Sequence, residues 1–257
     1  MNLQTLLKIA EDAASKSSKI IMEQYGADND IQFKLDKSIV TKVDLESEKI
    51  ILDILKSETP DYSILSEESG LSKIDKSEYM WIVDPLDGTT NYSKKIPFFA
   101  VQIALVQNGK VLLGVINLPF ENITLSAIKG EGLFVNGKKV ERNSETYQNS
   151  QTSMLFETYL DKTDLAILEK FKNASASTSI RIINSACTSM VYLALGRANI
   201  VIDRVDKPWD LAAGSLLVQE AGGTVTNFKG EEFDVFNPEC VATLGVNHSE
   251  MLQILNN

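Results

Sequence analysis

The chain opens with two stretches in which apolar residues recur at the spacing of an α-helix. In residues 2–25 apolar and small residues fall three or four positions apart, and the stretch ends near Gly26. This pattern predicts an amphipathic helix. A second stretch at 45–56 repeats the spacing and ends before Pro60, which cannot continue a helix. We therefore expect two amphipathic helices, each with one face for a core.

Short apolar runs rich in β-branched residues follow, separated by turn residues. The runs are 79–83, 98–106, 111–118, 123–128 and 132–135. Asn-Gly pairs at 108–109 and 136–137 are typical of hairpin turns. The first half thus predicts an antiparallel sheet flanked by the two helices.

After about residue 145, strand-like and helix-like segments alternate. The expected strands are 153–158, 199–203, 224–228 and 241–246, and the expected helices are 163–171, 185–195, 209–221 and 249–255. Such alternation favours an α/β arrangement. The polar stretch 141–151 is the best boundary candidate. We expect an N-terminal α+β half over 1–145 and a C-terminal α/β half over 146–257, packed as one compact unit.

Composition narrows the class of protein. Of the 257 residues 44% are apolar, enough for a real core, and no apolar run is long enough to cross a bilayer. The first twenty residues lack a basic start and a continuous apolar stretch, so we expect no signal peptide. With only two cysteines, we expect neither a disulfide framework nor a thiolate metal site. These features predict a cytoplasmic protein.

Charge and histidine content exclude several functions. The net charge of −10 disfavours nucleic acid as a partner. His248 is the only histidine, so a Ser-His-Asp hydrolase would have to use it, and a zinc site of the usual kind lacks its ligands. Carboxylate oxygen remains abundant, and it is the ligand preferred by Mg²⁺, Mn²⁺ and Ca²⁺.

Four acidic segments combine carboxylates with residues that shape turns or begin helices. They are 34–44 (KLDKSIVTKVD), 66–69 (SEES), 84–91 (DPLDGTTN) and 209–214 (WDLAAG). In the third, a predicted strand delivers Asp84, and Asp87 follows three residues later, so both carboxylates can point into one pocket. Gly88 allows a close approach of the backbone to a ligand, and Thr89 can begin a helix whose free N–H groups favour an anion. Metal ligands and a phosphate cradle are thus predicted together, although an ordinary surface turn explains this segment alone equally well.

The other segments also have simpler structural interpretations. Asp210 could stand at the positive end of a helix, and Asp44 could cap the second helix. Glu67 and Glu68 could lie in a solvated loop, and Lys34 could be an exposed lysine. Their ordered combination favours a site over these separate interpretations.

Two of the segments, taken with their flanks, resemble the signatures of the inositol monophosphatases, which are lithium-sensitive, Mg²⁺-dependent phosphatases. The signatures are 81–91 (WIVDPLDGTTN) and 209–214 (WDLAAG), with 220–223 (EAGG) closing the second. The resemblance covers nearly the whole chain in the same order. It implies an α+β fold, a layered αβαβα sandwich, which agrees with the predicted elements.

This resemblance implies an activity as well as a fold. A metal-activated water would hydrolyse a phosphate monoester of a small sugar or inositol, most directly inositol 1-phosphate. Inhibition by Li⁺, a homodimer, and no membrane or nucleic-acid partner are also implied.

Roles for the metal ligands follow from the same resemblance. Glu67, Asp84 and the Leu86 carbonyl would hold one Mg²⁺. Asp84, Asp87 and Asp210 would hold a second. A weaker third ion would sit near Glu67, and Mn²⁺ is a possible substitute.

Further roles are implied around the phosphate and the substrate. Gly88 and Thr89 would offer backbone N–H groups to the phosphate, and Lys34 would lie near it. Asp44 and the Thr89 hydroxyl would orient the attacking water with Glu67. The positions that match contacts to the ring hydroxyls are Ser185, Ala186, Asp203 and Asp210.

Some residues depart from the inositol monophosphatase pattern and leave the substrate open. Asp203 stands where many relatives have glutamate, one methylene longer. Additional cations near the signatures are Lys94, Lys95, Arg181, Arg204 and Lys207. Such residues are usually solvated charges, but they could receive a second anionic group, as in fructose 1,6-bisphosphate.

Alternative functions remain on the same fold. Relatives also act on 3′-phosphoadenosine 5′-phosphate or histidinol phosphate, but nucleotide-type relatives usually carry Lys-Glu-Phe where this chain has TNY at 90–92. A regulatory binding protein that retains the fold is a second class. The spacing of an EF-hand loop is absent, and the clustered carboxylates match a glycosidase poorly.

Overall fold

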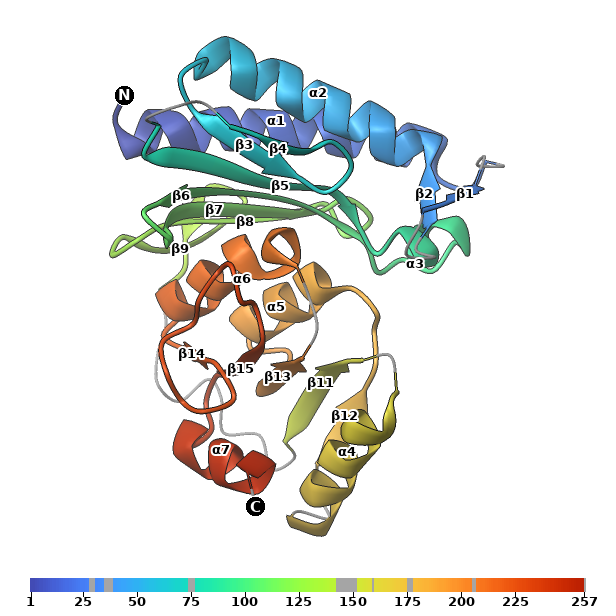
Figure 1. Ribbon diagram of the computed structural model, residues 1–257, viewed down its shortest axis with the longest axis vertical. Helices are drawn as coiled ribbons and strands as arrows, with labels where there is room; N and C mark the ends of the chain where they lie inside the picture. Colours follow the sequence, from blue (N-terminus) through green and yellow to red (C-terminus); the bar gives the residue numbers. More distant parts are fainter. Residues whose placement is uncertain are drawn as a thin grey trace.

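The computed structural model describes residues 1–27, 31–34, 39–73, 77–141, 152–158, 160–174, 178–204 and 207–256. Its elements stack as alternating layers of helices and sheets (Figure 1). Two long helices cover one face of a large sheet, two more lie between this sheet and a second one, and two cover the far side. The predicted αβαβα sandwich is therefore confirmed. Among the described helices, none combines the length and the apolar character needed to span a membrane.

The outer layer of the first half is the predicted helix pair, α1 (Leu3–Gln24) and α2 (Lys42–Glu58). Both bury the apolar stripe that their spacing predicts against the large sheet. Helix α2 begins at Lys42 rather than at residue 45 because Asp44 supports its first turn. The Asp44 carboxylate accepts the N–H of Thr41, the residue before the helix, at 2.8 Å.

The large sheet has the strand order β10-β9-β8-β7-β6-β5-β3-β4. Its strands are β3 (Ser63–Ser66), β4 (Gly70–Ser72), β5 (Tyr79–Asp87), β6 (Ala100–Gln107), β7 (Lys110–Leu118), β8 (Ile123–Ile128), β9 (Gly132–Val135) and β10 (Lys138–Lys139). Neighbouring strands are antiparallel except β3 and β5, which are parallel. The short strands β3, β4 and β10 were not predicted, because their sequences carry no extended apolar run. Two further short strands, β1 (Ile31–Phe33) and β2 (Ile39–Thr41), pair separately.

Strand β5 lies between two hydrophobic cores and ends at the candidate site. Trp81 packs into the core beneath α1 and α2, and Ile82 packs into the core on the opposite face. Because side chains alternate along a strand, Asp84 shares the face of Ile82. The strand ends at Asp87, and the short helix α3 (Thr89–Ser93) follows.

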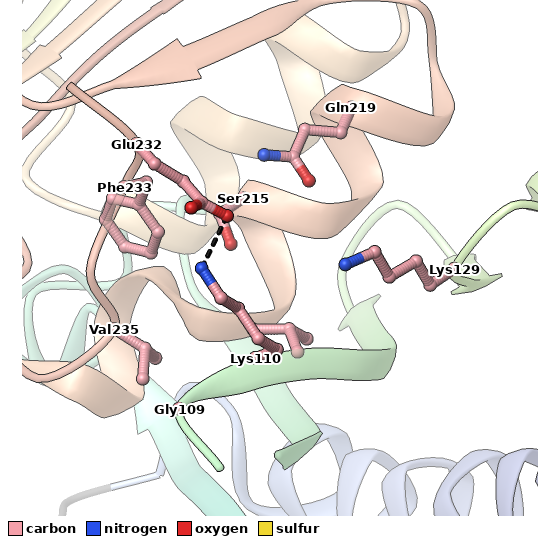
Figure 2. A pocket seen from close by; sticks show the side chains of 9 residues that line it. Gly109, Lys110, Lys129, Ser215, Gln219, Glu232, Phe233 and Val235 are labelled. Atoms are coloured by element: carbon pink, nitrogen blue, oxygen red, sulfur yellow. Dashed lines mark ion pairs between the residues drawn. The ribbon is translucent and has the colours of Figure 1, made fainter. Parts of the chain in front are cut away.

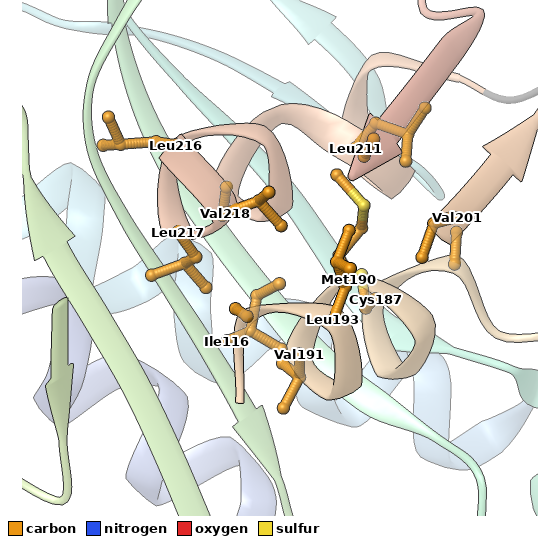
Figure 3. Close-up of a cluster of buried hydrophobic side chains, with 14 of the residues drawn as sticks. Ile116, Cys187, Met190, Val191, Leu193, Val201, Leu211, Leu216, Leu217 and Val218 are labelled. Atoms are coloured by element: carbon orange, nitrogen blue, oxygen red, sulfur yellow. The ribbon is translucent and has the colours of Figure 1, made fainter. Parts of the chain in front are cut away.

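The middle layer consists of α5 (Ala186–Ala194) and α6 (Pro208–Glu220), two almost wholly buried helices. Figure 3 shows Met190 and Val191 of α5 packed among apolar side chains of α6, with Ile116 of the large sheet beside them. Helices that are apolar on all sides require burial on all sides. Their position between two sheets supplies it.

Glycines set the spacing at two crossings of this layer. A Cβ at Gly214 in α6 would lie 2.7 Å from Cβ of Met190 in α5. A Cβ at Gly114 in β7 would lie 2.9 Å from Cα of Ala213. Neither position has room for a side chain. Helix α6 is thereby held close to both neighbours, which fixes the end of the helix that carries Asp210.

The second sheet is mixed and has the order β12-β11-β13-β15-β14. Its strands are β11 (Ser153–Glu157), β12 (Ser179–Arg181), β13 (Ile200–Asp203), β14 (Thr224–Thr226) and β15 (Cys240–Thr243). Strand β11 runs parallel to β12 and β13, whereas β15 is antiparallel to its neighbours. The outer helices α4 (Lys162–Ala174) and α7 (His248–Asn256) cover it. The alternating pattern of the second half is thus confirmed, and the unpredicted β12 is a partly exposed edge strand. The proposed boundary between residues 145 and 146 lies outside the described residues.

Candidate active site

The site begins with two buried carboxylates at the end of β5. Asp84 is 1% exposed and Asp87 is 8% exposed. The Leu86 N–H donates to the Asp84 carboxylate at 2.9 Å, at the point where the pairing of β5 with β6 becomes irregular between Asp84 and Asp87. Asp87 accepts a short hydrogen bond from the Ser185 hydroxyl and a second, at 3.1 Å, from the Cys187 N–H. The first turn of α5 therefore anchors a carboxylate about a hundred positions earlier in the chain.

Burial and mutual repulsion shift the pKa values of these groups. Burial, and then the charges of Glu67, Asp87 and Asp210, raise the pKa of Asp84 well above its ordinary value. Burial also raises the pKa of Asp87 to about 7, although the hydrogen bond from Ser185 opposes this shift. Carboxylates from three separate segments thus lie close enough for their charges to disfavour ionisation of Asp84. A bound cation would remove that repulsion.

Asp210 approaches this cluster from the first turn of α6. Its carboxylate accepts the N–H of Lys207 at 2.7 Å, so the simple interpretation as a helix-terminal residue holds. Its charge also raises the pKa of Asp84, so it lies within electrostatic reach of the cluster. One side chain therefore serves both the helix start and the acidic cluster.

Asp44 and Thr89, predicted as a pair, are hydrogen-bonded. The Thr89 hydroxyl lies 2.7 Å from Oδ1 of Asp44 and 3.0 Å from the carbonyl oxygen of Leu86. Oδ2 of Asp44 accepts the Thr41 hydroxyl at 2.5 Å. Burial raises the pKa of Asp44, and the hydrogen bonds from both threonines lower it. Capping α2 and holding Thr89 are simultaneous roles of this carboxylate.

The turn between β5 and α3 requires a glycine. Gly88 has φ of 80°, and a Cβ there would lie 2.6 Å from the carbonyl oxygen of Phe98. The Asn91 amide in α3 donates to the carbonyl oxygens of Phe98 and Ile183, both at 2.9 Å. Asn91 therefore links the segment to the chain just before β6 and to the loop before α5. No pattern in the sequence pointed to the clamping contacts of Asn91.

Lys34 and Glu67 lie at the entrance to the cluster. Lys34 Nζ is 2.7 Å from Glu67 and 2.6 Å from Glu68. Burial opposes the charge of Lys34, but these two hydrogen bonds raise its pKa above the ordinary value. The Glu48 carboxylate, which sequence reasoning missed, accepts the N–H groups of Glu68 and Ser69 at 3.2 and 3.0 Å. Helix α2 thus fixes the loop that presents Glu67.

The residues expected to contact the substrate surround the start of α5. The Ser185 hydroxyl is directed to Asp87, and Ala186 begins the helix beside it. Asp203 is only 1% exposed, so a ring hydroxyl reaches it only if neighbouring side chains shift. Glu157, also missed in the sequence, accepts the Ser185 N–H at 3.1 Å and the Ser189 hydroxyl at 2.5 Å. The buried Glu157 carboxylate is thus hydrogen-bonded to the start of α5, and the start of α5 is in turn hydrogen-bonded to Asp87.

Three of the additional cations are either paired with acidic side chains or exposed. Arg204 pairs with Asp161 and, at 2.8 Å, with Asp164. Lys94 and Lys95 are exposed. These positions favour the interpretation as solvated or locally paired charges.

A pocket of about 40 Å³ lies away from the carboxylates, between the β6–β7 turn and α6. Figure 2 shows that the Lys110–Glu232 ion pair, at 2.6 Å, crosses it. None of the residues that line it belongs to the acidic cluster. Its size and position separate it from the candidate chemistry.

The donor set of the acidic cluster fits a hard divalent cation. Buried carboxylates and a backbone carbonyl are the oxygen ligands that Mg²⁺ prefers. Burial is the largest cause of the raised pKa values of Asp84 and Asp87, and neighbouring carboxylates add to it, so a bound cation would favour their ionised forms. Such a site can bind and polarise a phosphate ester.

Comparison with known proteins gives one consistent relationship. The model of the family described as "Inositol monophosphatase family" matches residues 2–257. A fructose-1,6-bisphosphatase/inositol-1-monophosphatase from Thermotoga maritima is 35% identical over 242 residues, covering 94% of this chain and 92% of the relative. The Nus factor SuhB from Pasteurella multocida is 33% identical over 234 residues, covering 89% of this chain and 87% of the relative.

A solved structure agrees with the sequence matches. The structure of an IMPase from Thermotoga maritima superposes with a TM-score of 0.86 at 32% identity, covering 98% of this chain and 97% of that one. The similarity therefore extends through both sheets and all helical layers.

Proposed function

The chain belongs to the inositol monophosphatase family and is a phosphatase, and on this premise we propose that it hydrolyses inositol 1-phosphate in a Mg²⁺-dependent reaction. One observation carries the proposal. Buried carboxylates at the end of β5 lie within electrostatic reach of the half-buried Asp210 of α6, and the nearby Asp44 and Thr89 are hydrogen-bonded to each other. That combination offers charge for cations and a positioned hydroxyl for a water within one site.

The acidic residues divide into two proposed metal positions. Glu67, Asp84 and the Leu86 carbonyl would hold one ion. Asp84, Asp87 and Asp210 would hold a second. When bound, these ions would offset the charge of the phosphate and favour deprotonation of an attacking water. Lys34 forms an ion pair with Glu67 in this structure. When a metal ion binds, Glu67 would either contact both Lys34 and the ion or leave Lys34 for the ion.

Thr89 is proposed to orient the attacking water. When its hydroxyl proton is donated to Asp44, at 2.7 Å, its oxygen lone pairs remain free to accept a hydrogen bond from the water. Glu67 would accept a second. Two such hydrogen bonds would orient the water toward the phosphorus atom before the reaction begins, which lowers the entropic part of the barrier.

Phosphate and inositol would occupy the space between α3 and α5. The backbone N–H groups of Gly88 and Thr89 are proposed to face the phosphate, with Lys34 nearby. Because the Ser185 hydroxyl already donates to Asp87, the ring would meet the backbone of Ser185 and Ala186. Asp203 and Asp210 are the proposed acceptors for ring hydroxyls.

A phosphate-release assay with and without Mg²⁺ tests this function. We expect turnover of inositol 1-phosphate that stops in excess EDTA, and loss of most activity in Asp84→Asn, Asp87→Asn and Asp210→Asn. Glu232→Gln is the matched control, since it changes an exposed carboxylate paired only at the surface. Turnover that persists in EDTA would exclude the metal mechanism.

The substrate is tested by comparing kcat/KM across a panel. Inositol 1-phosphate should exceed 3′-phosphoadenosine 5′-phosphate, because the buried Asp203 favours a polyol over a flat base. Fructose 1,6-bisphosphate is included because a relative carries its name. If it leads and Lys94→Ala or Lys95→Ala reduces it selectively, the exposed lysines determine specificity instead.

Two further properties are proposed with the same function. Glu67→Gln should lower kcat far more than substrate affinity if Glu67 acts on the water. A homodimer, measured by light scattering over a range of concentrations, and inhibition of phosphate release by Li⁺ are expected as well.

A further inference from the structure

We propose that Cys187 makes the second metal position thiophilic, so that Zn²⁺ or Cd²⁺ binds Asp84, Asp87 and the Cys187 sulfur more tightly than Mg²⁺ binds the carboxylates. One oxygen of each aspartate and the Cys187 sulfur all lie within 4.8 Å of one another. Ligand atoms that share one zinc ion are roughly 3–4 Å apart. Small side-chain rotations would therefore bring the two carboxylate oxygens and the sulfur to coordination distance of one ion.

The position of Cys187 is fixed by the fold. Its N–H donates to Asp87 at 3.1 Å, and its sulfur donates to the carbonyl oxygen of Asp210 at 3.3 Å. It is completely buried in the first turn of α5. The sulfur is thus held between β5 and α6, the two elements that supply the acidic ligands.

A second, independent feature of the same face is the side chain of Gln102. It stands directly opposite Asp84 on β6 and is completely buried. Its oxygen accepts the N–H groups of Ala213 and Gly214 at 3.0 and 3.2 Å, which fixes the orientation of the amide.

This orientation leaves Nε2 of Gln102 without a hydrogen-bond partner among the described residues. Buried donors are normally paired. A water or carboxylate oxygen drawn toward a cation beside Asp84 would supply the missing acceptor. The unpaired amide lies on the face of the sheet that carries Asp84, so a group bound beside Asp84 could complete its hydrogen bonding.

The chemistry of sulfur separates this proposal from ordinary Mg²⁺ binding. Mg²⁺ is a hard ion that takes oxygen ligands, whereas thiolates select softer ions such as Zn²⁺. As a sulfur–metal bond forms, the thiol proton is released to solvent. A soft ion held by the sulfur would displace Mg²⁺ and stop phosphate release.

Cadmium titration of the metal-free full chain is the decisive experiment, because sulfur bound to Cd²⁺ gives an ultraviolet charge-transfer band. We expect a band that saturates at one ion per chain, remains in Cys240→Ser, is lost in Cys187→Ser and is displaced by Zn²⁺. Cys240, buried in β15, is the matched control. Calorimetry should show Cd²⁺ affinity weakened at least about 10-fold in Cys187→Ser.

Serine is the substitution of choice because its hydroxyl can keep the hydrogen bond to Asp210. If that variant does not fold, mass spectrometry of the wild type provides a second measurement. Bound Cd²⁺ should then slow alkylation of Cys187 but not of Cys240.

Three results would overturn the proposal: a band that survives in Cys187→Ser, Cd²⁺ binding to wild type without a band, or no Cd²⁺ binding. The proposal shares Asp84 and Asp87 with the proposed function, but the band needs no substrate. Failure of inositol phosphate hydrolysis and failure of sulfur coordination are therefore observed separately.

Discussion

At the scale of single residues, the candidate metal ligand Asp87 depends on a chain of buried hydrogen bonds. Asp87 is oriented by Ser185 and by the Cys187 N–H, and Ser185 is in turn held by Glu157. Buried hydrogen-bonded supports of this kind commonly tune metal affinity. Glu157 is therefore a positioning residue for the candidate metal site.

Glu157→Ala should lower kcat and Mg²⁺ affinity by about 10–100-fold, because Ser185 and Ser189 lose their common acceptor. Glu157→Gln should stay near wild type, since its oxygen can accept the Ser185 N–H and its NH₂ can donate to the Ser189 hydroxyl. The measurement is phosphate release as a function of Mg²⁺ concentration. Glu232→Ala serves as a surface control. Equal loss in the Gln and Ala variants would argue against a positioning role.

At the scale of elements, α6 connects packing to the site because the same helix carries Gly214 and Asp210. Replacing a mid-helix glycine by alanine normally favours the helix by about 1 kcal/mol. Here the added methyl group would meet Cβ and Cγ of Met190 at 2.7 and 2.8 Å. Cβ of Met190 is fixed by the backbone of α5 and cannot move away by side-chain rotation, so overpacking should dominate.

We therefore expect Gly214→Ala to lower the free energy of unfolding by about 1–2 kcal/mol net. Urea denaturation followed by circular dichroism measures it. Gln219→Ala, at an exposed position of the same helix, should change stability little. A Gly214→Ala protein as stable as wild type would show that α5 and α6 can separate without cost.

The only histidine joins three elements of the second half. One ring nitrogen of His248 in α7 is 2.9 Å from the Thr226 hydroxyl of β14, and the other is 2.8 Å from the Thr243 hydroxyl of β15. Burial lowers the pKa of His248 below its ordinary value of 6.5. The folded chain thus binds the proton less readily than the unfolded chain.

His248 should stabilise the fold fully above pH 6.5 and progressively less as the pH falls toward its lowered folded pKa. Glu68 and Asp87, whose pKa values are raised to about 7, act with the opposite sign, because their protonated forms are favoured in the fold. Only the difference between wild type and His248→Asn isolates the histidine. That difference, measured by urea denaturation from pH 5 to 8 (roughly the range in which histidine titrates), should shrink as the pH falls. A constant difference would contradict the prediction.

At the scale of the whole molecule, charge and metal binding are linked. The chain carries 35 acidic and 25 basic residues, and part of the excess negative charge is buried at the candidate site. Without a cation, repulsion within that cluster destabilises the fold. Binding to the folded state alone should therefore raise thermal stability.

Mg²⁺ at about 100 times its Kd should add about 2.7 kcal/mol per site, or roughly 5–10 °C in Tm for a chain of this size. The shift should be larger at pH 8 than at pH 6 (values chosen roughly one unit either side of neutral), because the carboxylates must be deprotonated to bind. Asp84→Asn should raise the Tm of the metal-free protein and abolish the Mg²⁺ shift. Differential scanning calorimetry with and without EDTA measures both. A shift that Asp84→Asn leaves unchanged would place the ion elsewhere.

Local sequence determined much of the fold. Helical spacing predicted α1 and α2, and apolar runs between Asn-Gly turns predicted the central strands, because periodic burial leaves its pattern in the sequence. The segment from Asp84 to Thr89 predicted a metal and phosphate site by itself, since two carboxylates three residues apart at the end of a strand can point into one pocket. The family resemblance ordered the remaining acidic residues around it.

The tertiary structure alone decided which side chains support that chemistry. Glu157 and Glu48 lie in ordinary strand and helix sequence, and their partners come from other segments. Cys187 was expected to have no part in a metal site, and only the approach of α5 to β5 places its sulfur beside Asp84 and Asp87. Periodicity tells which face of an element is buried, but a contact between residues a hundred positions apart depends on how the layers pack.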